Sequence, residues 1–157
     1  MPFELVCLGA DHGGFDLKEI IKNYLNSKRI NFKDFGTFSK ESVDYVDYAI
    51  LLAKKVAENK KNCGILCCSS GIGMSIVANK IAGIRAALCV NNFHAEFARR
   101  HNNANIICFG QKVSNSEQVL SMIDIFLSTD FDGGRHENRV NKILNLEKIK
   151  ENINERS

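Results

Sequence analysis

A cysteine pair opens a loop of small residues near the middle of the chain. The stretch Cys67-Cys68-Ser69-Ser70-Gly71-Ile72-Gly73-Met74-Ser75 follows an apolar run and leads into a segment with helical spacing. Exposed N–H groups in such a loop can hold a phosphate or another oxyanion. A thiol at the same place could serve as a base, a nucleophile, a metal ligand or a redox group. Two simpler interpretations stay open: the glycines only make a tight turn, and the cysteines are packed small residues.

The glycine loop lacks the two best-known phosphate-binding patterns. It has no Lys where a P-loop requires one, and Ile76 stands where a dinucleotide-binding loop has Gly or Ala. Neighbouring strand residues point to opposite faces, so Cys67 and Cys68 cannot easily share a metal ion. Cys68 is nearer to the helix start, where a thiolate is favoured. We therefore take Cys68 as the candidate for chemistry and Cys67 as the candidate for packing.

Three other places carry side chains suited to chemistry. His12 follows Asp11 at the end of an apolar run and precedes two glycines, which is unusual for a core histidine. His101 ends the helical segment HAEFARRH. Arg135 and Arg139 are four residues apart, so they share one helix face and could grip a phosphate or belong to a solvated surface.

Composition limits the classes of function. The chain has 157 residues, 45% hydrophobic and 25% charged, with a net charge of +3. These values are typical of one globular domain, residues 1–157, and no basic stripe predicts nucleic-acid binding. No apolar stretch approaches the roughly 18 residues of a membrane helix, and the start lacks a signal-peptide pattern, so we expect a cytoplasmic protein. The six cysteines, mostly inside apolar runs, fit that compartment as free thiols.

Apolar runs alternate with segments of helical spacing. Five segments predict strands: FELVCLGA and CGILCC as buried runs, INFKDFG with alternating spacing, and GIRAALCV and NANIICFG. Helices are expected around residues 17–25, 43–58 and 73–82, over HAEFARRH, over residues 116–127, and from about 136 into a polar tail. Strands that alternate with helices at short connections predict an α/β fold, a parallel sheet with helices on both faces.

Polar residues gather where three of the predicted strands end. The first strand ends in residues 11–14, the third in residues 68–71, and the fifth in residues 110–112. The carboxyl ends of parallel strands lie at one edge of the sheet, where ligands bind in such folds. The sequence therefore predicts a ligand site at this edge.

Together these segments resemble the ribose-5-phosphate isomerase type B family, which includes isomerases of allose and galactose 6-phosphates. Five ordered blocks carry the resemblance over nearly the whole chain: ADHGGFDLK, DYVDYA, GILCCSSGIGMSIVANKIAGIRAAL, ARRHNNANIICFG and GGRHENRV. The resemblance implies a Rossmann-like three-layer α/β/α sandwich with no metal and no cofactor. It also implies a homodimer or dimer of dimers, an active site between two subunits, and a last helix (about 136–153) packed on the partner.

The resemblance also implies roles for individual residues. Cys68 matches the catalytic base and His101 the acid/base that opens the sugar ring, while Ser70 could move a proton between two oxygens. The matching substrate contacts are Asp11, His12, Tyr45, Ser69, Ser70, Gly71, Ile72, Gly73, Asn102, Lys112, Arg135 and Arg139. The last three are the cationic contacts, and the resemblance assigns the two arginines to the neighbouring subunit.

Three positions depart from the usual family pattern. Ser69 stands where Gly is more usual, and Ser70 replaces a frequent Thr but keeps the hydroxyl. Lys112 stands where Arg is common, which exchanges a planar fork for a point charge. Relatives without the cysteine use a glutamate one position after the second glycine, and here that position is Met74. We therefore expect the base to be the Cys68 thiolate.

The expected function is an aldose–ketose isomerase that interconverts ribose 5-phosphate and ribulose 5-phosphate, a step of the pentose phosphate pathway. The reaction would pass through ring opening and a cis-enediolate stabilised by N–H groups of the loop. The alternatives are an isomerase of allose or galactose 6-phosphate, a non-catalytic sugar-phosphate or nucleotide sensor, and a thiol redox switch at Cys67 and Cys68. An inactive descendant should lose the base or the histidine, and both Cys68 and His101 are present.

Overall fold

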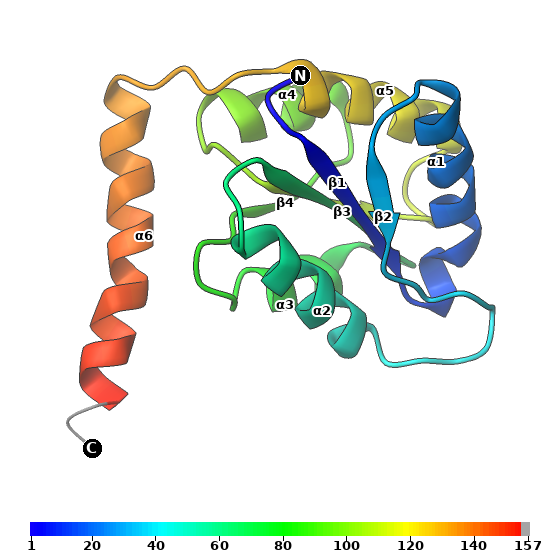
Figure 1. The fold of residues 1–157 in the computed structure, drawn as a ribbon, viewed down its shortest axis with the longest axis horizontal. Coiled ribbons are helices and arrows are strands. Elements are labelled where there is room, and N and C mark those ends of the chain that lie inside the picture. The colour runs from blue at the N-terminus through cyan, green and yellow to red at the C-terminus, as the bar shows by residue number, and fades with distance from the viewer. Residues whose placement is uncertain (155–157) are drawn as a thin grey trace.

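Five parallel strands form one sheet in the computed structural model, which describes the backbone of residues 1–154 and the side chains of residues 1–148. They are β1 (Leu5–Ala10), β2 (Phe32–Asp34), β3 (Asn62–Cys68), β4 (Ala86–Leu88) and β5 (Ile106–Gly110). Their order across the sheet is β2-β1-β3-β5-β4 (Figure 1). The predicted five-stranded parallel sheet is confirmed. Residues 155–157, the end of the predicted polar tail, lie outside the described residues.

Helices cover both faces of the sheet. They are α1 (Phe15–Ser27), α2 (Tyr45–Ala57), α3 (Ile72–Ala78), α4 (Asn92–Arg100), α5 (Ser116–Ser128) and α6 (Arg135–Asn154), with a 3-10 turn, η1 (His12–Gly14), before α1. Apolar side chains of α1, α4 and α5 pack on one face, and those of α2 and α3 pack on the other. The result is the predicted three-layer Rossmann-like sandwich.

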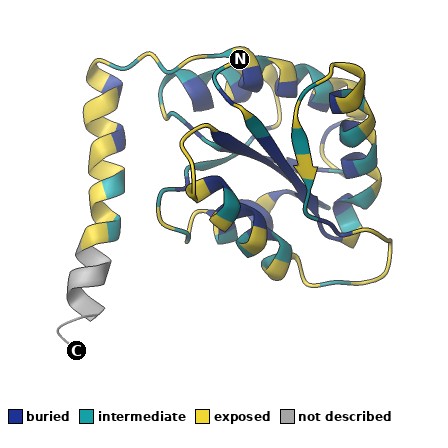
Figure 2. Cartoon of the chain, viewed as in Figure 1, coloured by how far each residue is buried: buried dark blue, intermediate teal, exposed yellow. Residues whose placement is uncertain are grey.

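The core explains why β3 is a continuous apolar run. All seven of its residues are buried, and the inner strands β1, β3 and β5 form the buried centre of the sheet, whereas β2 and β4 at its edges are partly exposed (Figure 2). Successive side chains enter opposite layers, because side chains alternate along a strand. Cys67 belongs to the layer with α1, α4 and α5, and Cys68 belongs to the layer with α2 and α3.

Local hydrogen bonds set the helix ends. The Asp44 carboxylate caps α2 by accepting the Val46 N–H at 2.9 Å. The predicted extent of the third helix, 73–82, was wrong at its C-terminal end, because α3 stops at Ala78. The Asn79 side chain accepts the Ala86 N–H at 2.8 Å and donates to the Ala86 carbonyl at 2.9 Å, which ties the chain to β4 instead.

The last helix, α6, lies beside the layered body and outside its two helix layers, and most of its described side chains are exposed (Figures 1 and 2). Its start is anchored by the buried His136. Farther along, both Glu147 carboxylate oxygens accept the Gly83 N–H, at 2.9 and 3.0 Å. Ile143 and Leu146 remain 43% and 59% exposed. Neither α6 nor any other described helix is long and apolar enough to cross a membrane.

Candidate active site

The loop after β1 packs directly on the loop after β3, at the carboxyl edge of the sheet. A Cβ at Gly14 would lie 2.4 Å from the Cys67 carbonyl oxygen, and one at Gly13 would lie 2.3 Å from the Ser69 hydroxyl. Glycine, which has no Cβ, permits this approach. The buried Asp11 carboxylate fixes the turn by accepting the Gly14 N–H at 3.1 Å. The polar group predicted at the end of β1 therefore lies beside the serine-glycine loop.

The loop after β5 joins the same junction. A Cβ at Gly110 would lie 2.6 Å from the Ser70 carbonyl, so glycine is required here too. The Lys112 N–H donates to the Ser69 carbonyl at 3.0 Å, which holds the lysine backbone against the loop. Three loops that are far apart in the sequence therefore form one polar edge, as predicted.

Cys68 ends β3 with its sulfur at this edge. The Sγ atom accepts the backbone N–H of Gly71 at 2.9 Å, and the residue is 6% exposed. Gly71 has a φ of +79°, and a Cβ there would lie 2.5 Å from a Leu88 methyl group, so glycine is needed for this turn. An N–H donated to sulfur favours the charged thiolate. The arrangement suits a thiolate that removes and returns a proton.

Cys67 occupies the opposite side of the sheet and is fully buried. Burial raises the pKa of its thiol well above the ordinary value, so it stays protonated and serves packing. The two neighbouring sulfurs therefore point into different layers and offer no shared metal or disulfide site. Met74, at the glutamate position of some relatives, is fully buried in the same layer as Cys68.

His12 and Tyr45 lie beside the loop of residues 69–73. The Val43 N–H donates to His12 Nδ1 at 3.2 Å, which leaves the proton of the neutral ring on Nε2. The Tyr45 ring covers the start of α3, since a Cβ at Gly73 would lie 2.7 Å from it. Both His12 and Tyr45 are exposed, so each can donate a hydrogen bond to an oxygen of a bound molecule.

His101 and Asn102 lie at the opposite, amino edge of the sheet. His101 caps the C-terminal end of α4, which runs back across the sheet from the carboxyl edge. On the paired strands β3 and β5, Gly64 lies beside Ile106. At about 3.3 Å per residue, the stretch from Gly64 to Cys68 already spans roughly 13 Å, and His101 precedes Ile106. Within one chain, His101 and the Cys68 sulfur therefore lie at opposite edges of the sheet.

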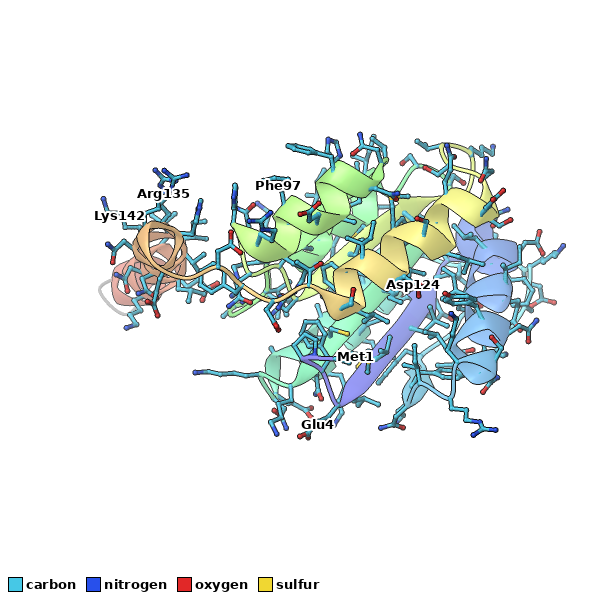
Figure 3. All side chains as sticks on the ribbon, turned by 90° about the horizontal axis from the view of Figure 1, so that it is seen from above. Met1, Glu4, Phe97, Asp124, Arg135 and Lys142 are labelled. Carbon is cyan, nitrogen blue, oxygen red and sulfur yellow. The ribbon has the colours of Figure 1, made fainter. Side chains whose placement is uncertain are left out.

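The start of α6 joins His101 at this amino edge. The His136 ring stacks on the His101 ring, with centroids 3.9 Å apart and an angle of 11° between the planes. Arg135 precedes His136, and Arg139 follows one turn later; both arginines are exposed. Arg135 and Phe97 of α4 project toward the same side of the molecule (Figure 3). The two arginines therefore stand beside the predicted ring-opening histidine.

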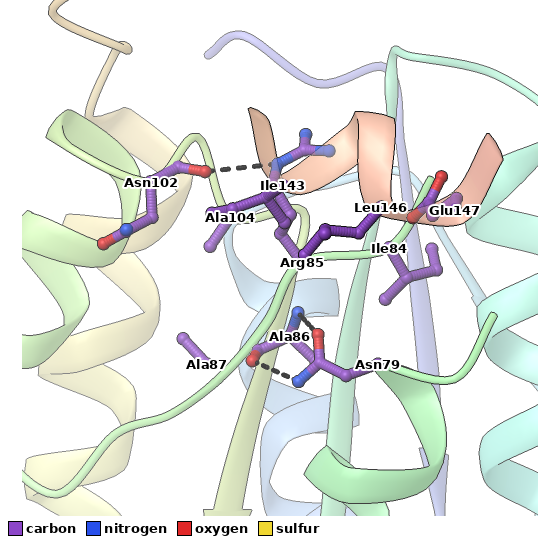
Figure 4. Close-up of a pocket in the computed structure, with 10 residues that line it drawn as sticks. All are labelled: Asn79, Ile84, Arg85, Ala86, Ala87, Asn102, Ala104, Ile143, Leu146 and Glu147. Atoms are coloured by element: carbon purple, nitrogen blue, oxygen red, sulfur yellow. Dashed lines mark hydrogen bonds between the residues drawn. The ribbon is translucent and has the colours of Figure 1, made fainter. Parts of the chain in front are cut away.

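Arg85 holds the loop that follows His101, and sequence reasoning did not single it out. Its Nε donates to the Asn102 carbonyl at 3.1 Å (Figure 4) and to the Asn103 carbonyl at 2.9 Å. Asn103 has a φ of 47°, so the loop turns sharply at this point. Arg85 also lines a cavity of about 540 Å³ beside Ile143 and Leu146 of α6. The block GIRAAL contained this arginine, but one arginine near a strand gives no sign of its carbonyl partners.

His101, Asp132 and His136 each offer one possible metal ligand, and these atoms lie within 4.8 Å of one another. A ring nitrogen binds a metal ion in the plane of its ring, and two stacked parallel rings do not meet at such a point. The Asp132 carboxylate is also held by Arg100 Nε, 3.2 Å from both oxygens, and this hydrogen bond lowers the pKa of Asp132. The geometry is that of an ion pair beside stacked rings.

The chain as a whole is similar to one family of enzymes. Its sequence matches the Ribose/Galactose Isomerase family over residues 6–143. This chain belongs to the ribose/galactose isomerase family. The ribose-5-phosphate isomerase B of Escherichia coli is 40% identical over 142 residues, which cover 90% of this chain and 95% of that protein.

Solved structures of ribose/galactose isomerases share the fold as well. Ribose-5-phosphate isomerase B of Clostridium thermocellum matches with a TM-score of 0.91 and 42% identity, over 93% of this chain and 99% of that one. The enzyme of Mycoplasma genitalium, solved with bound ribulose-5-phosphate, matches with a TM-score of 0.88 and 39% identity, over 92% and 96%. The resemblance inferred from the five sequence blocks is confirmed.

The structure sorts the residues predicted from this isomerase family into two groups. The carboxyl-edge group contains Asp11, His12, Tyr45, Cys68, Ser69, Ser70, Gly71, Ile72, Gly73 and Lys112. The amino-edge group contains His101, Asn102, Arg135 and Arg139. The resemblance implied a neighbouring subunit for the two arginines only. In the structure, His101 and Asn102 lie with them.

Proposed function

We propose that this chain interconverts ribose 5-phosphate and ribulose 5-phosphate, the activity for which its relatives are named. The observation that carries the proposal is the Cys68 sulfur, which accepts the Gly71 N–H at 2.9 Å at the junction of three polar loops. A thiolate in such a place can abstract a proton beside a carbonyl group. The surrounding donors suit a sugar phosphate, and none of the proposed steps uses a cofactor.

The proposed site is shared between two copies of this chain. One copy supplies the carboxyl-edge group, and the other supplies the amino-edge group. The separation of Cys68 from His101 within one chain supports this arrangement. The exposed Ile143 and Leu146 support a further part of the proposal, that α6 packs on the partner of a homodimer. Whether two dimers then associate is left to measurement.

Ring opening is the first chemical step, because ribose 5-phosphate is mostly a closed furanose. The bond between C1 and the ring oxygen breaks, the C1 hydroxyl loses its proton, and the ring oxygen gains one to become the C4 hydroxyl. His101 of the second copy would carry these protons, since imidazole gains and loses a proton near neutral pH.

Isomerisation follows on the open chain. The Cys68 thiolate takes the proton from C2, and the electrons of that bond form the enediolate between C1 and C2. N–H groups of residues 69–73 would stabilise its negative oxygen; one such donor typically contributes about 3–4 kcal/mol. Ser70 would move a proton from the C2 oxygen to the C1 oxygen, and Cys68 would return its proton to C1, which leaves the ketone at C2.

The phosphate is the part of the substrate that several cations can hold. Lys112 and His12 of one copy, with Arg135 and Arg139 of the other, would surround it. Arginine grips a phosphate with two parallel hydrogen bonds, and the lysine adds a point charge. Binding energy from this remote group would orient the reacting carbons.

A direct assay tests the proposal. The purified protein is given ribose 5-phosphate, allose 6-phosphate and galactose 6-phosphate in turn, and ketose formation is followed by absorbance and by NMR. We expect turnover of the pentose phosphate at least tenfold above that of either hexose phosphate. Preference for a hexose phosphate would contradict the substrate, and turnover of none would contradict the enzymatic function.

A further inference from the structure

The parallel stack of His101 and His136 is the closest aromatic contact in the described part of the chain. The ring centroids lie 3.9 Å apart, with 11° between the planes. His136 is only 7% exposed although it opens a helix whose next residues face solvent. The fold therefore buries one imidazole against the face of another at the amino edge.

Other groups restrain the His101 ring from the remaining sides. The Phe97 ring meets it edge-on, with centroids 4.6 Å apart and planes at 85°. An Asp132 oxygen lies 4.0 Å from His101 Nε2, and Arg100 holds that carboxylate through both oxygens. The His101 side chain still keeps 33% of its surface exposed. The ring is thus supported on one face and one edge while another part stays open to a substrate.

Charges around the stack distinguish the two rings. His136 Nε2 accepts a hydrogen bond from Arg135 Nε at 3.4 Å, which requires that nitrogen to be unprotonated. Burial lowers the pKa of His136, and positive charge on His101, Arg135 and Arg139 lowers it further, against the opposing effect of Asp132. On α4, Glu96 and Arg100 pair with each other at 3.0 Å. The unprotonated Nε2 of His136 therefore faces Arg135, and the Asp132 carboxylate lies beside the His101 ring.

We propose that His136 is a positioning residue for His101: its ring, stacked on the His101 ring, fixes the plane of the imidazole that would open the sugar. The inference rests on the proposed function, because it concerns the ring-opening step of that reaction. His136 itself touches no reacting atom. Its removal should slow only the step that His101 performs.

Two substitutions of His136 test whether a flat ring stacked on His101, rather than a histidine as such, supports catalysis. His136→Asn removes the flat ring, and we expect kcat with ribose 5-phosphate to fall roughly ten- to a hundredfold, with KM changed less than about threefold. His136→Phe keeps a flat ring against His101, and kcat should stay within about fivefold of the unmodified enzyme. His94→Asn, at an exposed position of α4, is the matched control and should leave both constants unchanged. Melting temperatures establish that each variant is folded.

Isotope exchange shows which step is affected. Ribulose 5-phosphate is an open chain, so exchange of its C1 hydrogen for deuterium in D2O needs the Cys68 thiolate but no ring opening. We expect His136→Asn to keep this exchange within about twofold while it loses isomerisation of closed ribose 5-phosphate. An equal loss of both would indicate general damage to the site and overturn the proposal, as would full kcat in His136→Asn or loss in His136→Phe equal to that in His136→Asn.

NMR titration of the histidine rings tests the stack without any assay of activity. In His101→Asn the pKa of His136 should rise, because the neighbouring positive charge that lowers it is gone. Independent titration of the two rings would overturn the proposal. Failure of the unmodified protein to isomerise any sugar phosphate would instead count against the proposed function, and the titration would still report on the stack.

Discussion

The Gly71 backbone N–H donates a hydrogen bond to the Cys68 sulfur at 2.9 Å. The bond joins the last residue of β3 to the turn that begins α3, so the same turn that positions the sulfur also stabilises its charged form. Backbone donors do not titrate and move little, which makes this a stable environment for a base that must lose and regain one proton in each cycle.

Replacing Cys68 with alanine removes the proposed base together with the acceptor of the Gly71 N–H. We expect kcat for ribose 5-phosphate to fall by at least about a thousandfold, the range found for loss of a general base, while the sugar phosphate still binds. Coupled kinetics measure the first effect and calorimetric titration the second. Cys68→Ala with near-normal turnover would rule out the thiolate as the base.

Cys67→Ala is the matched control at the neighbouring position. Its thiol is fully buried in the layer of α1, α4 and α5, so the change leaves a small cavity. We expect a loss of about 1 kcal/mol in the free energy of unfolding, measured in urea, with kcat within about twofold. An activity loss as large as that of Cys68→Ala would show that the wrong cysteine had been chosen.

A mixture of two inactive variants tests whether the site is shared between subunits. Cys68→Ala and His101→Asn are unfolded together at equal concentrations and refolded. If each site takes its thiol from one chain and its histidine from the other, random pairing restores about a quarter of the sites. If both groups came from the same chain, no site would be restored. Native mass spectrometry confirms that hybrids form, and each variant refolded alone provides the baseline.

Alkylation should distinguish Cys68 from the other five cysteines. Burial raises the pKa of Cys7 to about 11 and that of Cys89 to about 12, and it also raises the values for the remaining three, Cys63, Cys67 and Cys108. A raised thiol pKa means less thiolate at neutral pH and slower reaction. We expect iodoacetamide at pH 7.5 to add one group to the folded protein, at Cys68, as mass spectrometry of peptides would show.

Protection by substrate completes the alkylation experiment. Ribose 5-phosphate bound at the carboxyl edge should slow labelling of Cys68, while labelling of the urea-unfolded protein at all six cysteines stays unchanged. Rapid modification of several cysteines in the folded protein would contradict the assignment of Cys68 as the one accessible thiol.

Arg85 offers a test of how the His101 loop is held. Arg85→Met leaves the Asn102 and Asn103 carbonyls without their donor, so we expect about 1–3 kcal/mol less stability and a lower kcat. Arg85→Lys keeps the charge but loses the geometry that serves two carbonyls, and it should recover only part of the kcat. Urea unfolding and steady-state kinetics measure the two effects. Full kcat in Arg85→Met would show that the loop needs no such support.

The fold was predictable because its strands carry strong local signals. The run CGILCC is buried on both faces, and a continuous apolar run of that length predicts such a strand. The end of α3 was not predictable, because the Asn79 side chain stops the helix by bonding to Ala86. The spacing of apolar residues along a helix does not reveal a contact between residues that belong to different elements.

The site was predictable in part for the same reason. Alternation along β3 separated Cys67 from Cys68, and the ends of three strands located the carboxyl-edge group. Nothing in the spacing indicated that the His101 ring rests on His136, since that contact depends on the path of the chain between α5 and α6. Sequence pattern singled out the candidate residues, and tertiary structure alone shows how they are held.

The position of Cys68 and of His101 at opposite edges of the sheet has a consequence for when the protein can work. If the proposed site is shared between two copies, a newly made single chain would hold every proposed reactive group and catalyse nothing. A single chain, which lacks a complete site, would then not open the ring of a sugar phosphate without completing the isomerisation. The protein would begin to turn over substrate at the moment it finds its own copy, so its abundance would set its activity more steeply than in proportion.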